Sequence, residues 1–473
     1  MSINTQVAVI GGGPGGYAAA FFAADLGMEV TLIDLEKNPG GVCLYRGCIP
    51  SKALLHIAKL ISEAEEAKKW GVDFGEPKID IDKVRSFKND VVNKLTGGLG
   101  QLSKQRKVNF IQGRAEFINS SSLKIKKTDG TVEEVVFGKA ILATGSVPAK
   151  IPGLSIDSPR VMDSTSALEL NDIPERLLVI GGGYIGLELT SVYAALGSRV
   201  TVVEMTPALL PGADRDLVTP LARRLEKKLD KIMLDTKVVS ITDEGSRLKV
   251  IFEGKNVSET EQYFDKALIS IGRKPVTAGL GLENTKIKIN ERGFVVVDKQ
   301  LKTDDPNIYA IGDIVGNPML AHKAAAEGKT AVEAIAGHKT AFEPNAIPAV
   351  VFTDPEIAWA GLTETEAKEK NIKIEVAKFP WGANGRATTI DRNEGLTKLI
   401  IEPETERILG VAITGVGAGD MIAEGTLAIE MGAVVKDLSL TIHPHPTLSE
   451  TMMGAAEVFY GHATDMYRPK RKQ

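Results

Sequence analysis

The chain has 473 residues, enough for about three domains of ~150 residues each. Its hydrophobic content of 43%, charged content of 25% and net charge of −4 are typical of a globular protein and offer no basic surface for nucleic acid. It has two cysteines and no apolar run of ~18 residues, which argues against a secreted disulfide framework and against membrane insertion. We therefore expect a cytoplasmic protein without a metal site, and we interpret the basic tail at 468–472 as a solvated end.

The N-terminal segment predicts a dinucleotide-binding unit. An apolar strand at 7–10 leads into a glycine-rich turn and a helical stretch, and a second strand at 30–34 ends in Asp34. Gly11 permits the tight turn, Gly13 lets the backbone approach a pyrophosphate, and Gly16 allows close helix–strand packing. Asp34 lies eighteen positions after Gly16, where a carboxylate accepts hydrogen bonds from a ribose.

Both cysteines, Cys43 and Cys48, lie in the next segment, at 41–52. A disulfide between them would close too short a loop to add much stability through chain entropy. We therefore interpret the pair as a redox dithiol. Further on, residues 59–69 predict a helix, and residues 107–142 alternate apolar and polar around Thr128-Asp129-Gly130, which predicts an antiparallel hairpin insert.

A second copy of the nucleotide fingerprint begins with the apolar strand at 177–180. Gly181, Gly183 and Gly186 repeat the glycine spacing, and Glu204 again lies eighteen positions after the third glycine. A carboxylate there pairs with a 2′-hydroxyl and repels a 2′-phosphate, and the residues that follow supply no arginine. The second site is therefore predicted to take NAD rather than NADP, and the first, next to the dithiol, a flavin.

The remaining segments complete the outline of the fold. Residues 232–271 repeat the alternating antiparallel pattern, and from about residue 345 strands alternate with helices without a third glycine fingerprint. This last part is predicted to be a different kind of domain.

Five motifs occur in order along the chain, at 41–52, 143–146, 270–275, 303–313 and 443–450. With them the chain resembles the flavin-dependent pyridine nucleotide–disulfide oxidoreductases over essentially its whole length. It departs from the usual pattern at three places. Asp34 stands where glutamate is usual, Tyr45-Arg46 replaces Asn-Val between the cysteines, and His443-Pro444 replaces His-Ala.

The resemblance implies an α/β fold with two Rossmann-like domains, for FAD and NAD, and a C-terminal α+β dimerisation or interface domain. The expected boundaries are 1–146 for the first part of the FAD domain, 147–270 for the NAD domain, 271–344 for the second FAD part, and 345–473 for the interface domain.

The resemblance also assigns the reacting groups. Cys43 would be the interchange thiol and Cys48 the flavin-facing thiolate. His445 would be the base, oriented by Glu450, and would act on the dithiol of the other monomer in a homodimer. The His445–Pro446 peptide is expected to be cis.

Lys52 would lie near the flavin edge, paired with Glu188. The further residues implied for FAD are Gly113, Thr144, Gly145, Ser146, Asp313, Met319 and Ala321; Gly272 is implied for NAD. Tyr184 either gates nicotinamide entry or only packs, and His322 is expected to be structural.

Within the family, the chain looks like the members that oxidise dihydrolipoamide. That implies two partners, the lipoyl domain and the subunit-binding domain of the E2 subunit of a 2-oxo-acid dehydrogenase complex, or the H protein of glycine cleavage. Two alternatives stay open: an NADPH-dependent disulfide reductase of the same fold, and a non-catalytic structural subunit.

Overall fold

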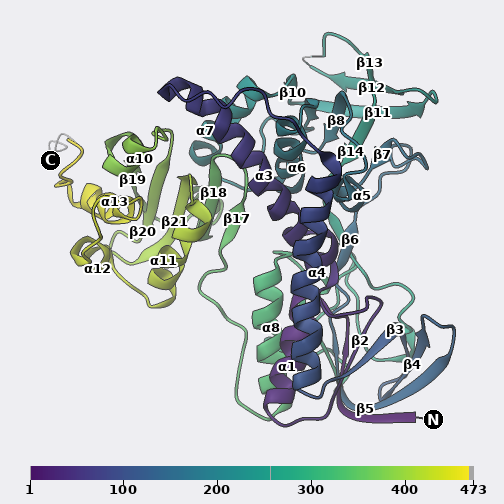
Figure 1. Cartoon of the computed structure of the whole chain (residues 1–473). Coiled ribbons are helices and arrows are strands. Elements are labelled where there is room, and N and C mark those ends of the chain that lie inside the picture. Colours follow the sequence, from purple (N-terminus) through teal and green to yellow (C-terminus); the bar gives the residue numbers. More distant parts are fainter. Residues whose placement is uncertain (1, 256, 468–473) are drawn as a thin grey trace.

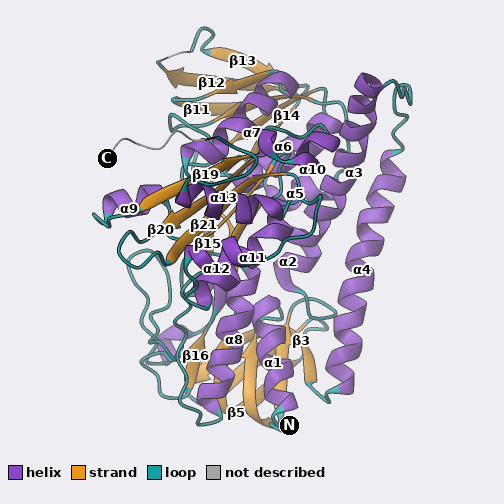
Figure 2. Ribbon diagram, turned by 90° about the vertical axis from the view of Figure 1, so that its left-hand side faces the viewer, coloured by secondary structure: helices purple, strands orange, loops and turns teal. Residues whose placement is uncertain are grey.

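The computed structural model describes residues 2–255 and 257–467, so the basic tail at 468–472 lies outside it. Figure 2 shows sheets at three levels along the long axis of the molecule, with the helix α4 (Ile81–Gln105) running beside two of them. Within the described residues, no helix has the length and apolar character needed to cross a bilayer.

The first sheet has a parallel part, in the order β3–β2–β1–β5–β16, and an antiparallel part in which β4 pairs with β3 and β5. Its strands are β1 (Ser2–Ile10), β2 (Val30–Asp34), β3 (Asn109–Asn119), β4 (Ser122–Lys127), β5 (Val132–Leu142) and β16 (Ile308–Ala310). The predicted hairpin is confirmed as the β4–β5 connection. The hairpin belongs to the same sheet as the nucleotide-binding strands. β3 and β5 are each eleven residues long, and each pairs with β4 near one end and with a parallel strand near the other.

Two helices, α1 (Pro14–Asp25) and α8 (Ala321–Ile335), lie side by side on this sheet (Figure 1). A Cβ on Gly15 would lie 2.9 Å from the Ala324 oxygen, and one on Gly328 would lie 2.7 Å from the Gly15 oxygen. The glycines therefore allow the two helix backbones to touch.

The redox segment forms two consecutive helices, α2 (Gly41–Arg46) and α3 (Cys48–Glu66). The helix predicted at 59–69 is the end of α3 and the 3₁₀ turn η1 (Ala67–Trp70). The helix α3 starts earlier than predicted, at Cys48. Pro50 does not prevent this start, because it lies in the first turn, where a backbone N–H has no partner within the helix. The 25-residue α4 (Ile81–Gln105) packs on α3 and was not predicted.

The second glycine fingerprint lies on a five-stranded parallel sheet in the order β10–β9–β8–β14–β7. The strands are β7 (Val161–Met162), β8 (Arg176–Ile180), β9 (Arg199–Val203), β10 (Lys231–Met233) and β14 (Lys266–Ile269); the helices are α5 (Ser164–Glu169), α6 (Tyr184–Ala195) and α7 (Arg215–Lys228). An antiparallel sheet follows, formed by β11 (Thr236–Asp243), β12 (Leu248–Gly254) and β13 (Glu261–Phe264). It contains the alternating pattern predicted within 232–271.

A short ribbon joins the two nucleotide-binding units where the chain crosses between them. It pairs β6 (Ser146–Pro148) antiparallel with β15 (Arg273–Pro275). Two 3₁₀ turns, η2 (Leu282–Asn284) and η3 (Gly312–Ile314), follow in the chain.

The C-terminal part is an antiparallel sheet, in the order β17–β18–β21–β20–β19, covered by helices (Figure 1). Its elements are β17 (Ala349–Val351), β18 (Glu356–Gly361), α9 (Glu364–Glu369), β19 (Glu375–Pro380), η4 (Trp381–Ala383), α10 (Gly385–Thr389), β20 (Leu396–Ile401), β21 (Ile408–Gly415), α11 (Ala418–Glu430), α12 (Val435–Leu440) and α13 (Glu450–Tyr460). This confirms the predicted change of architecture.

A buried lysine joins the C-terminal sheet to the second unit. Lys398 on β20 is fully buried, and its Nζ lies 2.7 Å from Asp214, 2.9 Å from Asp216 and 2.8 Å from Glu364. Lys378, at the surface, pairs with the latter two carboxylates. The three acidic groups have the spacing of a metal site, but the Lys398 ammonium lies among them and forms an ion pair with each.

Candidate functional site

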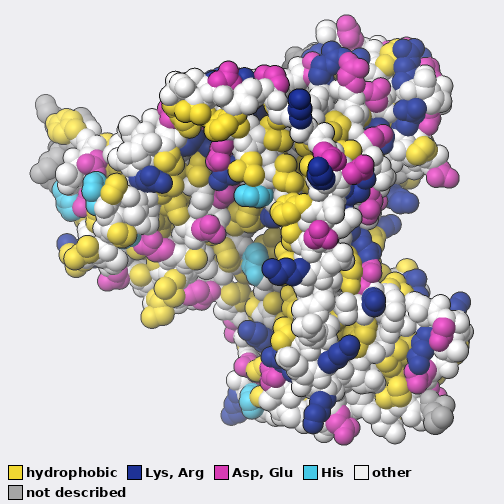
Figure 3. Space-filling view, viewed as in Figure 1, with side chains coloured by type: hydrophobic (Ala, Val, Ile, Leu, Met, Phe, Trp, Pro, Cys, Tyr) yellow, Lys and Arg dark blue, Asp and Glu magenta, His cyan; other side chains and the backbone are white. Residues whose placement is uncertain are grey.

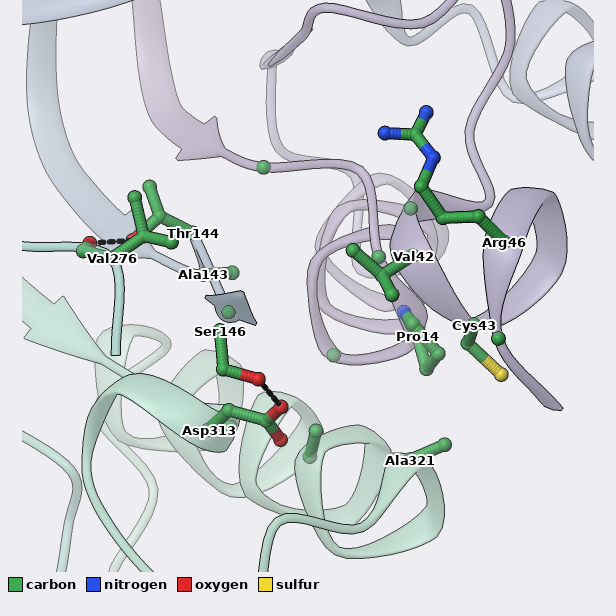
Figure 4. Close-up of a pocket in the computed structure, with 18 of the residues that line it drawn as sticks. Pro14, Val42, Cys43, Arg46, Ala143, Thr144, Ser146, Val276, Asp313 and Ala321 are labelled. Carbon is green, nitrogen blue, oxygen red and sulfur yellow. Dashed lines mark hydrogen bonds between the residues drawn. The ribbon is translucent and has the colours of Figure 1, made fainter. Parts of the chain in front are cut away.

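One continuous cavity runs between the first sheet, the redox helices and the start of α8 (Figure 4). It is lined by eleven residues predicted for the flavin: Gly11, Gly13, Asp34, Lys52, Gly113, Thr144, Gly145, Ser146, Asp313, Met319 and Ala321. Cys43, Cys48, Glu188 and Tyr184 line the same cavity. Gly16 does not line the cavity. It packs against the backbone of the glycine turn, where a Cβ would lie 1.8 Å from the Gly11 oxygen. Its role is packing, as the fingerprint predicts.

The start of α1 is shaped for an anion. Gly13 is its N-cap, no side chain caps the first turn, and a Cβ on Gly13 would find only the Gly41 Cα, 4.0 Å away. Free N–H groups and open space are what a pyrophosphate needs at a helix N-terminus. Asp34 accepts a hydrogen bond from the Gly12 N–H at 2.5 Å, so its carboxylate also fixes the glycine turn.

On the opposite side of the cavity, Asp313 is held by a chain of hydrogen bonds. The Ser146 hydroxyl donates to Asp313 at 2.5 Å (Figure 4). It also accepts from Arg273 Nε at 2.7 Å. The Thr144 hydroxyl donates to the Val276 carbonyl at 2.8 Å. These contacts fix the Asp313 carboxylate at the cavity wall. Arg273 belongs to the motif at 270–275, but the motif does not predict its contact with Ser146. That contact depends on the pairing of β6 with β15.

The two cysteines lie on the cavity wall as free thiols. Cys48 is the first residue of α3, so it lies at the positive end of the helix dipole. The hydrogen bond from the Cys43 thiol, helped by the charge of Lys52 and opposed by burial, lowers the pKa of Cys48 to about 7. The same hydrogen bond, together with burial, raises the pKa of Cys43. Cys48 is therefore the thiolate of the pair.

Lys52 and Glu188 form the predicted ion pair, with Nζ 2.8 Å from Oε2. Glu188 is almost fully buried, and its other oxygen accepts a hydrogen bond from the Phe352 N–H at 3.1 Å. The Lys52 ammonium also lies over the Phe352 ring, with Nζ 4.4 Å from the ring centroid. No sequence motif points to Phe352, which belongs to the C-terminal part of the chain.

The departure at Tyr45-Arg46 acts on the loop that follows Asp34. The Tyr45 hydroxyl donates to the Asn38 carbonyl at 3.1 Å, and Arg46 forms an ion pair with Glu36. Both side chains thus tie the redox segment to the loop at 36–38, and the Arg46 charge is paired away from the thiols.

The second fingerprint repeats the geometry of the first. Glu204 accepts a hydrogen bond from the Gly182 N–H at 2.7 Å, as Asp34 does from Gly12. A Cβ on Gly186 would lie 2.3 Å from the Gly181 oxygen, whereas one on Gly183 would find nothing within 4 Å. The helix α6 starts at Gly183 without a side-chain cap. This is again a free helix N-terminus next to a carboxylate. Gly272, at φ +119, lies in the crossover just before β15.

His445 lies away from the cavity in the same chain, in the segment between α12 and α13. Its Nδ1 is 2.9 Å from Glu450 Oε1, and 76% of its side chain is exposed. The other Glu450 oxygen accepts from the Thr447 N–H at 2.7 Å, which fixes the carboxylate. The predicted cis peptide at His445–Pro446 is confirmed. His322 contacts the Pro348 carbonyl at 2.7 Å, in keeping with a structural role.

Comparison with known proteins agrees with this geometry. Residues 5–328 match the family model described as pyridine nucleotide-disulphide oxidoreductase, and residues 347–456 match its dimerisation domain. The chain belongs to the pyridine nucleotide-disulphide oxidoreductase family. The predicted fold class is thereby confirmed, and the family's cofactors, FAD and NAD, are those of this oxidoreductase.

Individual members of the family cover nearly the whole chain. It is 49% identical over 471 residues to the dihydrolipoyl dehydrogenase of Haemophilus influenzae, covering 100% of this chain and 98% of the relative. It is 44% identical to that of Geobacillus stearothermophilus, covering 97% of both. Among solved structures, it is similar to LpdA from Mycobacterium tuberculosis, with a TM-score of 0.89, 27% identity, and coverage of 96% of this chain and 99% of the other.

Another similar structure is that of a disulfide reductase. The HOCl-induced flavoprotein disulfide reductase RclA from Escherichia coli, in its Cu(II) complex, matches with a TM-score of 0.85 and 31% identity, covering 96% of this chain and 99% of that one. The family fold thus carries more than one disulfide chemistry, and the choice for this chain depends on its own residues.

Proposed function

We propose that this chain is a dihydrolipoyl dehydrogenase, which oxidises dihydrolipoamide to lipoamide with NAD+ as the electron acceptor. The observation that carries the proposal is the Cys43–Cys48 pair on the wall of the flavin cavity, with Lys52 and Glu188 beside it. The names of the relatives, at 44–49% identity over almost the full length, favour the lipoamide substrate. Glu204 favours NAD+ over NADP+.

The proposed chemistry begins with Cys43 and Cys48 as a disulfide. One substrate thiolate attacks the Cys43 sulfur, breaking the disulfide and releasing Cys48 as a thiolate. The second substrate sulfur then displaces Cys43, closing lipoamide and leaving the dithiol. His445 accepts the proton of the first substrate thiol, and the proton of the second passes to the departing Cys43 sulfur. Bound FAD supplies a two-electron path from this dithiol to NAD+, so the products are lipoamide, NADH and a proton.

We further propose that His445 of one chain serves the dithiol of a second. The residues that line the dithiol cavity all fall between positions 10 and 324, so His445 of the same chain is not among them. Large apolar side chains are exposed around α11 and α12, including Leu427, Met431, Leu440 and Ile442. Figure 3 shows hydrophobic side chains on this part of the surface. A homodimer through the dimerisation domain would cover them.

The partners follow from the substrate. Dihydrolipoamide is carried on a lipoyl domain, so we propose docking to the E2 subunit of a 2-oxo-acid dehydrogenase complex, through its lipoyl and subunit-binding domains, or to the H protein of glycine cleavage.

The test is to mix the purified holoenzyme with dihydrolipoamide under anaerobic conditions and then add NAD+ or NADP+ separately. We expect a long-wavelength absorption band on reduction, and NADH formation with NAD+ only. Reduction by NADPH without reaction with dihydrolipoamide would instead support a biosynthetic disulfide reductase. No redox activity with either would leave the structural-subunit alternative.

A further inference from the structure

A second histidine lies two residues before His445. The side chain of His443 is 5% exposed, against 76% for His445. Its Nε2 lies 2.7 Å from Glu424 Oε1, on α11, and its Nδ1 lies 2.9 Å from the Thr441 carbonyl oxygen. The two histidines therefore occupy opposite environments although they are neighbours in the sequence.

Both ring nitrogens of His443 face oxygen acceptors. An ionised carboxylate and a carbonyl can only accept, so both nitrogens must donate, and a histidine that donates twice is an imidazolium. The hydrogen bond with Glu424, together with the Thr441 carbonyl and the charges of Glu424 and Glu450, raises the pKa of His443 against the effect of burial. His443 is therefore a charged donor and has no free nitrogen to accept a proton.

His445 has the complementary arrangement. Its Nδ1 donates to Glu450, and its Nε2 makes no hydrogen bond within the described part of the chain. That nitrogen is the one free to accept a proton. The division between the two residues follows from their partners: Glu450 leaves one nitrogen of His445 open, whereas Glu424 and Thr441 use both nitrogens of His443.

The segment between Leu440 and Glu450 forms neither helix nor strand. It is held to α13 through Glu450, which binds His445 and the Thr447 N–H. It is held to α11 through His443. Two residues of chain span at most ~7 Å, so fixing His443 on α11 restricts where the His445 imidazole can lie.

We propose that His443 and Glu424 are a positioning pair for His445. The imidazolium–carboxylate contact anchors the segment to α11, so that the free nitrogen of His445 faces the dithiol of the partner chain in a fixed place. This inference rests on the proposed function, because it assigns His443 a part in the dihydrolipoamide reaction. A displacement of about 1 Å at a reacting group can cost on the order of 10²-fold in rate, so a positioning contact of this kind has a measurable effect.

The test compares two activities of the same purified holoenzyme. Dihydrolipoamide oxidation with NAD+ needs the base, whereas NADH oxidation by ferricyanide bypasses both the dithiol and His445. For His443→Phe and Glu424→Gln we expect kcat with dihydrolipoamide to fall roughly tenfold or more, while the ferricyanide rate stays within twofold and bound FAD is unchanged. His443→Gln keeps a donor toward Glu424 and should recover part of the loss. His338→Phe changes an exposed histidine elsewhere and should match wild type.

Each other result overturns the inference. A wild-type kcat in both His443→Phe and Glu424→Gln would show that the contact does not position the base. A parallel fall of both activities, with loss of FAD or of dimer, would show a general structural role. If the wild-type holoenzyme itself fails to oxidise dihydrolipoamide but reduces ferricyanide, the proposed function fails first, and this inference fails with it.

Discussion

At the scale of single residues, the site separates charge states between chemically similar groups. Cys43 and Cys48 are identical side chains, but Cys48 starts a helix, accepts a hydrogen bond from Cys43 and lies near Lys52, so it becomes the thiolate. The start of a helix, a hydrogen-bond donor and a nearby positive charge are enough to make two identical residues differ in reactivity.

The cysteine pair gives the first prediction. Cys43→Ser keeps a hydroxyl donor beside the Cys48 sulfur, so we expect a long-wavelength absorption band in the resting holoenzyme at neutral pH. Cys48→Ser should bind FAD without that band. Both variants should lose dihydrolipoamide turnover, and both should keep NADH–ferricyanide activity. Absorption spectra and steady-state rates check this, and retained dihydrolipoamide turnover in Cys48→Ser would refute the dithiol relay.

At the scale of elements, the two glycine fingerprints use glycine for two different reasons. Gly16 and Gly186 lie against the backbone oxygens of Gly11 and Gly181, so they serve the packing of helix on strand. Gly183 has open space in front of it and a φ of −78°, which any residue can adopt. The fold does not require glycine at this position, and we propose that its small size serves the bound cofactor.

This difference gives a matched pair of substitutions. Gly186→Ala places a Cβ 2.3 Å from the Gly181 oxygen and 2.5 Å from the Ser270 hydroxyl, and should lower the free energy of unfolding by about 1–3 kcal/mol. Gly183→Ala should leave thermal unfolding unchanged and raise KM for NAD+. Calorimetry and steady-state kinetics measure the two effects. Equal destabilisation by both variants would contradict the assignment of Gly183 to the cofactor.

At the scale of the whole molecule, buried charges hold the C-terminal sheet against the rest. Lys398 forms ion pairs with three carboxylates that come from two parts of the chain, and Arg224 on α7 pairs with Glu66 on α3 and Asp354 near β18. Phe352 contacts Lys52 from the same side. The flavin-side ion pair therefore depends on how the C-terminal part docks.

The buried lysine cluster, formed by Lys398, Lys378, Asp214, Asp216 and Glu364, gives a prediction on stability. Removing one partner of a buried ion pair typically costs ~3–5 kcal/mol, so Lys398→Met should lower the free energy of unfolding by about that amount. Lys378→Met, at the partly exposed lysine, should cost no more than ~1 kcal/mol. Denaturant unfolding measures both, and equal effects would contradict the importance of burial.

The same cluster has a pH dependence whose sign is fixed. Burial alone would raise the pKa of Asp214, but the hydrogen bond and charge of Lys398 outweigh it and hold the pKa of Asp214 below its ordinary value. Its contribution to stability is present above the unfolded pKa of ~3.9 and is lost as pH falls through the lower folded value. The stability difference between wild type and Lys398→Met should therefore shrink on acidification, and a constant difference would contradict this.

Several local features can be predicted from the amino-acid sequence: both glycine turns, the carboxylates that follow them, the dithiol, and the order of the motifs. These depend on residue type at fixed spacing, so they can be predicted without knowing what the chain packs against. The contacts between distant groups, in contrast, are visible only in the folded chain. Phe352 on Lys52, Glu424 on His443 and Lys398 among three carboxylates join residues 19 to 300 positions apart. No sequence spacing encodes such contacts, because they arise only when separately folded sheets and helices pack together.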